Sequence, residues 1–327
     1  MKKHHHTLSA FFFLIGLGLL YKLVKKVGAD EVLTTLHKLD WEILYILILP
    51  VTWYSVQSFA WYRVLKFNGQ KISLVRVFLA KIVGEAINTI TPLGFAGGDP
   101  VRIYLLQMDT SKTASTASVI IDRTVYTLGI VLMFLTTLTM AWLYLPLPNQ
   151  WRLALPLITI AFIVLCLILI RLQHRGGSFV FLSRTLGRLG IKKEKLEKLT
   201  HTMHELDQNI SAFYKRSHVH FFEILFYQFL GRLLGVIEIN LIAYLLGFPI
   251  TVTHALFLSS LSVLINVVFV FIPGSMGVME SGYGAVFYLL HLNPALGVSI
   301  QIFRRIRTFF WILLGLTILL LFKPRNK

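Results

Sequence analysis

Charged residues are scarce in this sequence. They make up 14% of the chain, while 56% of its residues are hydrophobic and the mean hydropathy is +0.71. A soluble domain has about 25% charged residues. Several apolar stretches approach or exceed the ~20 residues that a helix needs to cross a bilayer. We therefore expect an all-α, polytopic transmembrane helix bundle in which residues 1–327 form a single integral membrane domain.

The features of several catalytic classes are also missing. The single cysteine, Cys166, excludes an intramolecular disulfide. The sequence has no His/Asp spacing typical of a metal site, no GxSxG nucleophile motif and no Walker A loop. We therefore expect no metal and no other cofactor. The sequence also does not favour ATP-driven transport by this chain alone.

The formal net charge of +17 does not point to nucleic acid. The basic residues fall in the connections and at the ends of apolar segments, which the positive-inside rule explains more simply. The connection 171–217 is the strongest signal, with ten Lys/Arg against four Asp/Glu. We expect it to be cytoplasmic, together with the N- and C-termini, and we expect no nucleic-acid partner.

The apolar segments predict about six full spans. The first has a basic start like a signal peptide, but no small-residue cleavage site follows it, so we interpret it as an uncleaved span. The predicted spans are Ser9–Val24, Trp41–Val64, Ala114–Leu145, Leu153–Ile170, Phe221–Leu246 and Leu296–Phe322.

The cytoplasmic connection contains one amphipathic segment, Leu196–Phe213. Its apolar residues are spaced alternately three and four apart, which predicts a helix with one apolar stripe. Such a helix could lie on the inner membrane surface, where the lysines of 192–198 would meet anionic lipid. It could equally pack against the cytoplasmic face of the protein itself, or recruit a cytoplasmic partner.

Two short broken stretches, Pro92–Asp99 and Pro273–Glu280, interrupt apolar segments in the same way. Each has a proline, then a glycine-rich run, then a carboxylate seven positions after the proline. A helix cannot continue unbroken through such a run, and paired interruptions of this kind are typical of transporter sites near the bilayer midplane. We predict two broken re-entrant hairpins, 77–108 and 255–292. The charges of the connections before the two hairpins predict that the hairpins enter the membrane from opposite sides, as in an inverted repeat.

Ionisable residues within the apolar segments need an explanation, because each costs at least ~2.5–3.5 kcal/mol in the bilayer core. Lys81 and Glu85 are four apart and could pair on one helix face. Arg304, Arg305 and Arg307 lie in the last span, and arginines around a midplane cavity would favour an anionic head group. The supporting charges are Lys81, Glu85, Asp122, Arg123, Arg232 and Glu238.

The two broken stretches resemble the lysylphosphatidylglycerol synthase transmembrane region, a flippase-like family. That family typically has a Pro-Gly-Gly-Leu-Gly-Gly-Glu-Pro-x-Arg motif, which stands here as Pro92–Arg102, and a later Pro-Gly-Gly-Leu-Gly-x-x-Glu motif, which stands here as Pro273–Glu280. Leu93, Asp99, Ser275 and Met276 depart from the pattern. By motif position the resemblance carries over Gly94, Gly97, Gly98, Asp99, Pro100, Arg102, Pro273, Gly274, Gly277 and Glu280. We expect the substrate site at Gly94, Gly97, Gly98, Asp99, Arg102, Gly274, Gly277, Glu280, Arg304 and Arg305.

The resemblance implies a lipid flippase or transporter in the bacterial inner membrane. The lipid would be an anionic or aminoacylated phospholipid, or a hopanoid-type lipid. Full-length synthases of this kind also carry a soluble aminoacyl-transferase domain, which this sequence lacks, so we expect no enzyme activity. The alternatives are a membrane-embedded enzyme, with Asp99, Asp122, Glu238 and Glu280 as acid–base groups, and an accessory subunit of a lipid-modification pathway.

Overall fold

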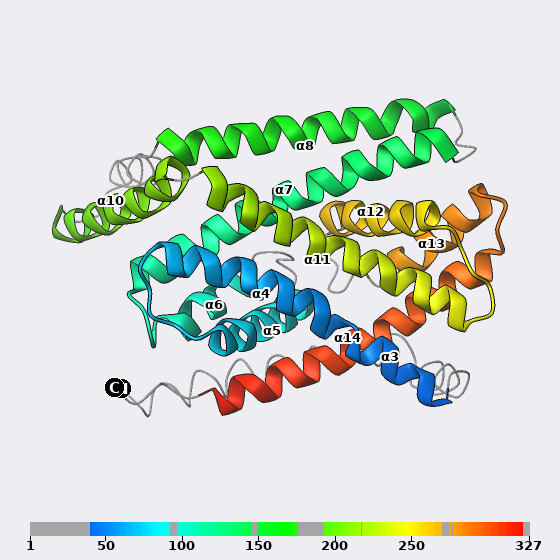
Figure 1. The fold of residues 1–327 in the computed structure, drawn as a ribbon, viewed down its shortest axis with the longest axis horizontal. Helices are drawn as coiled ribbons and strands as arrows, with labels where there is room; N and C mark the ends of the chain where they lie inside the picture. The colour runs from blue at the N-terminus through cyan, green and yellow to red at the C-terminus, as the bar shows by residue number, and fades with distance from the viewer. Residues whose placement is uncertain are drawn as a thin grey trace.

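The computed structural model describes residues 40–91, 97–144, 149–175, 193–216, 218–269, 275 and 277–322. These residues form helices joined by short turns, so the expected all-α bundle is confirmed (Figure 1). In chain order the elements are η1 Asp40–Glu42, α3 Ile43–Ile48, α4 Pro50–Phe67, α5 Leu74–Ile90, α6 Asp99–Leu106, α7 Lys112–Tyr144, α8 Asn149–Arg175, α10 Lys193–Arg216, α11 His218–Leu245, α12 Val252–Val268, α13 Val278–Leu289 and α14 Pro294–Leu321.

Four stretches are long and apolar enough to cross a membrane: Ile43–Phe67, Lys112–Tyr144, Arg152–Leu172 and His218–Leu245. Each corresponds to one of the six spans expected from the sequence. A fifth, Ser9–Val24, lies outside the described residues. The sixth is α14, whose 28 residues are long enough to span but include three arginines.

The predicted span Trp41–Val64 is not one uninterrupted helix. It consists of η1, α3 and α4, and α4 begins at Pro50. Because proline has no N–H and its ring collides with the carbonyl of residue i−4, the regular hydrogen-bond ladder cannot pass this point unchanged. The chain continues in helical backbone angles through Leu49, so α3 and α4 still form one apolar stretch.

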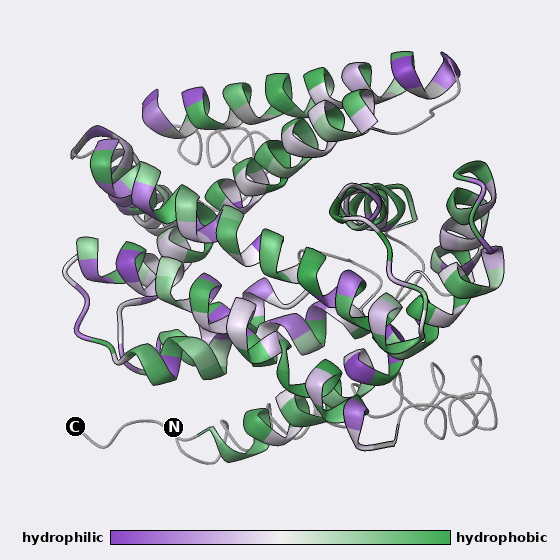
Figure 2. Cartoon of the chain, turned by 45° about the vertical axis from the view of Figure 1, so that its right-hand side comes forward, coloured by the Kyte–Doolittle hydropathy of each residue, from purple (hydrophilic) through white to green (hydrophobic). Residues whose placement is uncertain are grey.

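Helix α8 shows which surface meets lipid. Large apolar side chains such as Leu153, Leu157, Ile160 and Leu167 are more than half exposed along it. Figure 2 shows this helix, at the top of the bundle, as predominantly hydrophobic between its polar ends. A protein in water rarely exposes so large an apolar patch, whereas a bilayer solvates it. The chain is therefore a multi-pass membrane protein.

Two sets of four helices with the same chain order lie within the bundle. Both breaks fall where the sequence predicts them: α5 ends at Ile90 and α6 begins at Asp99, while α12 ends at Val268 and α13 begins at Val278. The first set is α4–α7 and the second is α11–α14. Helix α11 packs against α4 and α7, and α14 packs against α5 and α13 (Figure 1). The inverted relation of the two sets stays a prediction.

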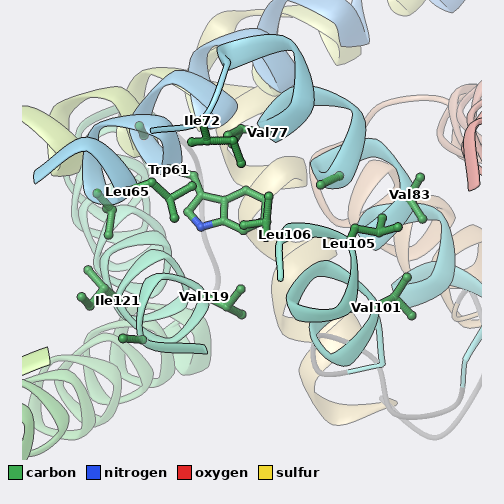
Figure 3. Packing of buried hydrophobic residues seen from close by; sticks show 14 of the residues in the cluster. Trp61, Leu65, Ile72, Val77, Val83, Val101, Leu105, Leu106, Val119 and Ile121 are labelled. Carbon is green, nitrogen blue, oxygen red and sulfur yellow. The ribbon is translucent and has the colours of Figure 1, made fainter. Parts of the chain in front are cut away.

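The largest apolar core holds the first set together. Trp61 of α4 is fully buried at its centre, with Leu106 of α6 and Val119 of α7 in the same cluster (Figure 3). The indole Nε1 donates a hydrogen bond to Ser118 Oγ at 3.2 Å. Tryptophan in a core usually finds such a partner for its N–H, and here the bond ties α4 to α7.

Helix α10 contains the amphipathic segment. Leu206, Ile210 and Phe213 of its apolar stripe are buried, and α10 packs against α7, α8 and α11. Ser211 Oγ donates a hydrogen bond to the His174 carbonyl at 3.0 Å. This half of the stripe therefore packs on the protein itself. Contact between anionic lipid and the lysines of 192–198 stays a prediction, because the side chains of 191–200 lie outside the described ones.

Candidate functional site: two charge clusters beside a polar cavity

A buried charge cluster joins the first broken hairpin to α7. Lys81 of α5 and Arg102 of α6 are fully buried, and Asp122 of α7 is 1% exposed. Asp122 Oδ2 lies 3.3 Å from Lys81 Nζ and 3.8 Å from Arg102 Nη1. Asp122 Oδ1 accepts a hydrogen bond of 2.6 Å from Gln228 Nε2 on α11. The Asp122 carboxylate on α7 thus contacts side chains of three other helices, α5, α6 and α11.

Asp99 and Glu85 complete this first cluster. Both oxygens of Asp99 accept hydrogen bonds of 2.9 Å from Arg123 Nε, and Asp99 Oδ1 lies 3.4 Å from Arg102 Nη1. Arg102 Nη2 donates to Glu85. The cluster contains three cations and three carboxylates, so its formal charges balance.

The sequence-based pairing of Lys81 with Glu85 is wrong. In the structure Lys81 pairs with Asp122, and Glu85 pairs with Arg102. The reason is tertiary: α7 brings Asp122 against Lys81, and α6 brings Arg102 against Glu85. Buried partners from other helices outweigh a neighbour one turn away, because a pair on one helix gains only about 0.2–0.5 kcal/mol.

Two glycines let the hairpin close tightly. A Cβ on Gly98 would overlap the carbonyl oxygen of Gly84, and a Cβ on Gly84 would overlap the Arg102 side chain. The Gly98 N–H donates to Asn88 Oδ1 at 2.6 Å. The start of α6 therefore lies directly on the backbone of α5, which a larger residue would prevent.

We expect Gly98→Ala to lower the free energy of unfolding by about 1–3 kcal/mol, the usual cost of overpacking. Thermal unfolding of the purified protein in detergent measures it. Gly235→Ala on α11 is the matched control, because nothing lies within 4 Å of an added Cβ there; its stability should stay the same or rise by up to ~1 kcal/mol. Equal melting temperatures for Gly98→Ala and the wild type would contradict the close approach.

A second charge cluster joins α11, α13 and α14. Glu238 of α11 is 1% exposed and accepts hydrogen bonds from Arg307 at 2.7 and 3.0 Å and from Arg304 at 3.2 Å. Glu280 of α13 accepts a hydrogen bond from Arg305 Nε. Glu280 also accepts the Gly277 N–H at 2.8 Å, so it caps the start of α13.

The carboxylates that close the two breaks make equivalent ion pairs. Asp99 pairs with Arg123, 24 residues later, and Glu280 pairs with Arg305, 25 residues later. Each pair fastens the short helix after a break to the long helix that follows it. The residue ten positions after the proline of each break also contacts that long helix: Arg102 faces Asp122, and Tyr283 Oη accepts a 2.7 Å hydrogen bond from Arg304. The contact pattern supports an internal repeat.

A polar cavity of about 310 Å³ lies between the two clusters. Residues from both halves line it, including Glu85 of α5, Arg232 of α11 and three arginines of α14. The lining side chains are Tyr54, Glu85, Ala86, Asn88, Thr89, Thr91, Tyr126, Arg232, Ser262, Val263, Asn266, Ser275, Met279, Gln301, Arg304, Arg305, Arg307, Thr308, Phe309, Trp311 and Ile312.

The structure distributes the predicted site residues over three environments. Arg304, Arg305, Arg232 and Glu85 line the cavity. Gly94 and Gly274 lie outside the described residues, as do Pro273 and Met276. The remaining residues lie at the starts of α6 and α13 or within the charge clusters behind the cavity wall: Lys81, Gly97, Gly98, Asp99, Pro100, Arg102, Asp122, Arg123, Glu238, Gly277 and Glu280.

Sequence reasoning missed several neutral polar residues of the site. Gln228 supports Asp122, Tyr126 and Gln301 line the cavity, and Tyr283 takes the place that Arg102 has in the first half. The signal was present, because these polar groups interrupt apolar helices and Tyr283 has the same offset from its proline as Arg102. Among the described residues no group of His, Cys, Asp and Glu could hold a metal ion.

These features define a class: a multi-pass helical membrane protein in which two broken hairpins border a polar cavity. The sequence matches the family described as "Lysylphosphatidylglycerol synthase TM region" over residues 9–315, so the chain belongs to this family. It is 25% identical to a "UPF0104 membrane protein" of Methanothermobacter thermautotrophicus, over 93% of this chain and 92% of that one. It is 24% identical to a UPF0104 membrane protein of Pyrococcus horikoshii, over 91% and 92% respectively. No solved structure matches.

Proposed function

We propose that this protein is a lipid transporter that moves an anionic lipid between the two leaflets, with the head group in the cavity. The observation that carries the proposal is the cavity lining, which includes four arginines and one carboxylate. A guanidinium presents paired N–H donors that match phosphate oxygens. Membership of a family named for a lipid supports the same reading.

The arrangement of the breaks supports movement of that head group. Helices interrupted at membrane depth are tolerated where they line a cavity, and transporters rock such units around a central site. Here each short helix is fastened to the long helix after it by a carboxylate–arginine pair at its start, Asp99–Arg123 or Glu280–Arg305. Exchange of these pairs during transport would open the cavity first to one leaflet and then to the other.

A membrane-embedded enzyme is the alternative, and the contacts favour it less. Asp99, Asp122, Glu238 and Glu280 each lie in contact with arginine or lysine. Such partners occupy the carboxylate oxygens, which suits a structural pair better than a proton donor. We propose the plasma membrane of a bacterium as the location, with both termini cytoplasmic. The basic connection 171–217 supports that orientation.

The test is leaflet exchange by purified protein in liposomes containing fluorescent phosphatidylglycerol, phosphatidic acid or lysylphosphatidylglycerol. We expect exchange above that of empty liposomes, and a tenfold or greater fall in Glu280→Gln and Asp99→Asn, since about 1.4 kcal/mol of lost coupling is tenfold. Glu223→Gln is the matched control: Glu223 pairs with Arg63 at 2.8 Å outside the cavity lining. Exchange no faster than in empty liposomes for every lipid would refute transport by this chain alone.

A further inference from the structure

The charges around the cavity do not balance. Among the described residues, the cavity network comprises seven cations and five carboxylates, an excess of two positive charges. The first cluster is balanced, so the excess lies in the second cluster and at Arg232. The cations are Lys81, Arg102, Arg123, Arg232, Arg304, Arg305 and Arg307, and the carboxylates are Glu85, Asp99, Asp122, Glu238 and Glu280.

Arg232 is the first source of the excess. Its Nε and Nη2 are fully covered, and neither has a hydrogen-bond partner among the described residues. The guanidinium lies over the Tyr126 ring, 4.0 Å from the ring centroid, and both side chains line the cavity. Stacking fixes its orientation, but a partly buried guanidinium with two covered, unbonded nitrogens and no anion is costly. An anion in the cavity would remove that cost.

Glu238 accounts for the second charge. It is the carboxylate partner of both Arg304 and Arg307, so one of their two positive charges is uncompensated. Both arginines line the cavity together with Arg232. The excess from the two sources therefore faces one space.

We propose that Arg232, with Arg304 and Arg307, binds a phosphate group carrying two negative charges, that is, a lipid with a terminal phosphomonoester. A phosphomonoester has a charge of about −1.5 to −2 at pH 7, which matches the excess. A phosphodiester carries one negative charge, and an added amino-acid ester brings a positive one, so both fit this network less well. The proposal rests on the proposed function for its lipid source, but the phosphate site stands on the charges alone.

The cavity volume is consistent with a head group. At about 310 Å³ the cavity is at the lower end of the ~300–1,000 Å³ range of ligand sites. A phosphate and the first carbons of a lipid fit in it, while the acyl chains would remain in the bilayer.

Binding of short-chain phosphatidic acid to the detergent-solubilised protein tests the proposal. Each titration is repeated with short-chain phosphatidylglycerol, lysylphosphatidylglycerol and inorganic phosphate. We expect phosphatidic acid to bind most tightly, and Arg232→Gln to weaken its binding about 10- to 100-fold, since a charged hydrogen bond contributes about 1.5–3 kcal/mol. Arg232→Lys should recover part of the affinity. Arg63→Gln, a substitution outside the cavity lining, should leave it unchanged.

A second measurement separates binding from folding. Without added lipid, Arg232→Gln should melt at the same or a higher temperature than the wild type, because it removes a covered charge that lacks an anion. Phosphatidic acid should raise the melting temperature of the wild type more than that of the variant. If inorganic phosphate alone raises the melting temperature as much as phosphatidic acid does, the site binds a free anion, and the proposal of a lipid ligand is refuted.

Two outcomes separate this inference from the proposed function. If leaflet exchange occurs and depends on Glu280, but phosphatidic acid has no advantage over phosphatidylglycerol, the phosphomonoester proposal is refuted while transport stands. If phosphatidic acid binds through Arg232 and no lipid is exchanged, the site stands and transport is refuted. Equal affinities of the wild type and Arg232→Gln for phosphatidic acid would also overturn the assignment of Arg232.

Discussion

Asp122→Ala is expected to lower the free energy of unfolding by about 3–5 kcal/mol, the cost of leaving a buried charge without its partner. Asp122 is 1% exposed and lies 3.3 Å from Lys81 Nζ, and Lys81 is itself fully buried. The substitution also deprives Gln228 of its 2.6 Å acceptor. Thermal and denaturant unfolding in detergent, with the yield of monodisperse protein, measures the loss.

A double-mutant cycle shows whether the loss arises from the buried pair. Lys81→Met in an Asp122→Asn background removes both charges while keeping similar side-chain volumes, so it should recover much of the stability lost in Asp122→Asn. Glu223→Gln breaks a part-exposed pair with Arg63 and should cost less than about 1 kcal/mol. Equal effects of Asp122→Ala and Glu223→Gln would contradict the assigned role of Asp122.

Glu238→Gln is expected to have a comparable effect, about 3–5 kcal/mol, because one carboxylate serves two arginines of α14. Its oxygens accept three hydrogen bonds from Arg304 and Arg307, between 2.7 and 3.2 Å long. An amide presents only one oxygen and turns its NH₂ group toward a guanidinium. Helix α14 should then lose its attachment to α11, which unfolding in detergent would detect.

The second-site change Arg307→Gln provides the control for Glu238. In the Glu238→Gln background it removes one of the two stranded guanidinium groups, so stability should rise relative to the single variant. Arg307→Gln alone should cost less than Glu238→Gln, because Arg304 still compensates the carboxylate. A further loss in the double variant, equal to the sum of the single losses, would show that the two residues act independently.

The sequence was sufficient to predict most helix positions. The segment Ala114–Leu145 was expected and Lys112–Tyr144 is observed, because a long apolar run that ends in prolines has few alternatives. Both breaks were also predictable, since Pro and Gly act through the local backbone. The interruption of the helix at Pro50 could have been predicted by the same rule. The membrane class followed directly from the hydrophobic composition.

The charge pairs could not be predicted in the same way. Lys81 finds Asp122 41 residues later, and Gln228 reaches the same carboxylate from a further helix. These contacts depend on how helices pack, which hydropathy does not encode. For the same reason the sequence indicated arginines near a cavity but did not reveal that Arg232 lies over Tyr126 with two of its nitrogens unbonded by described residues.

The balanced first cluster also constrains how the chain enters the membrane during synthesis. Helix α5 has 17 residues, about 26 Å at 1.5 Å per residue, and with α6 it carries four ionised side chains of the cluster. Two of their partners, Asp122 and Arg123, emerge from the ribosome only with α7. The α5–α6 hairpin alone is thus too short and too polar to partition into lipid. We expect it to enter the bilayer together with α7, whose Asp122 and Arg123 complete the cluster.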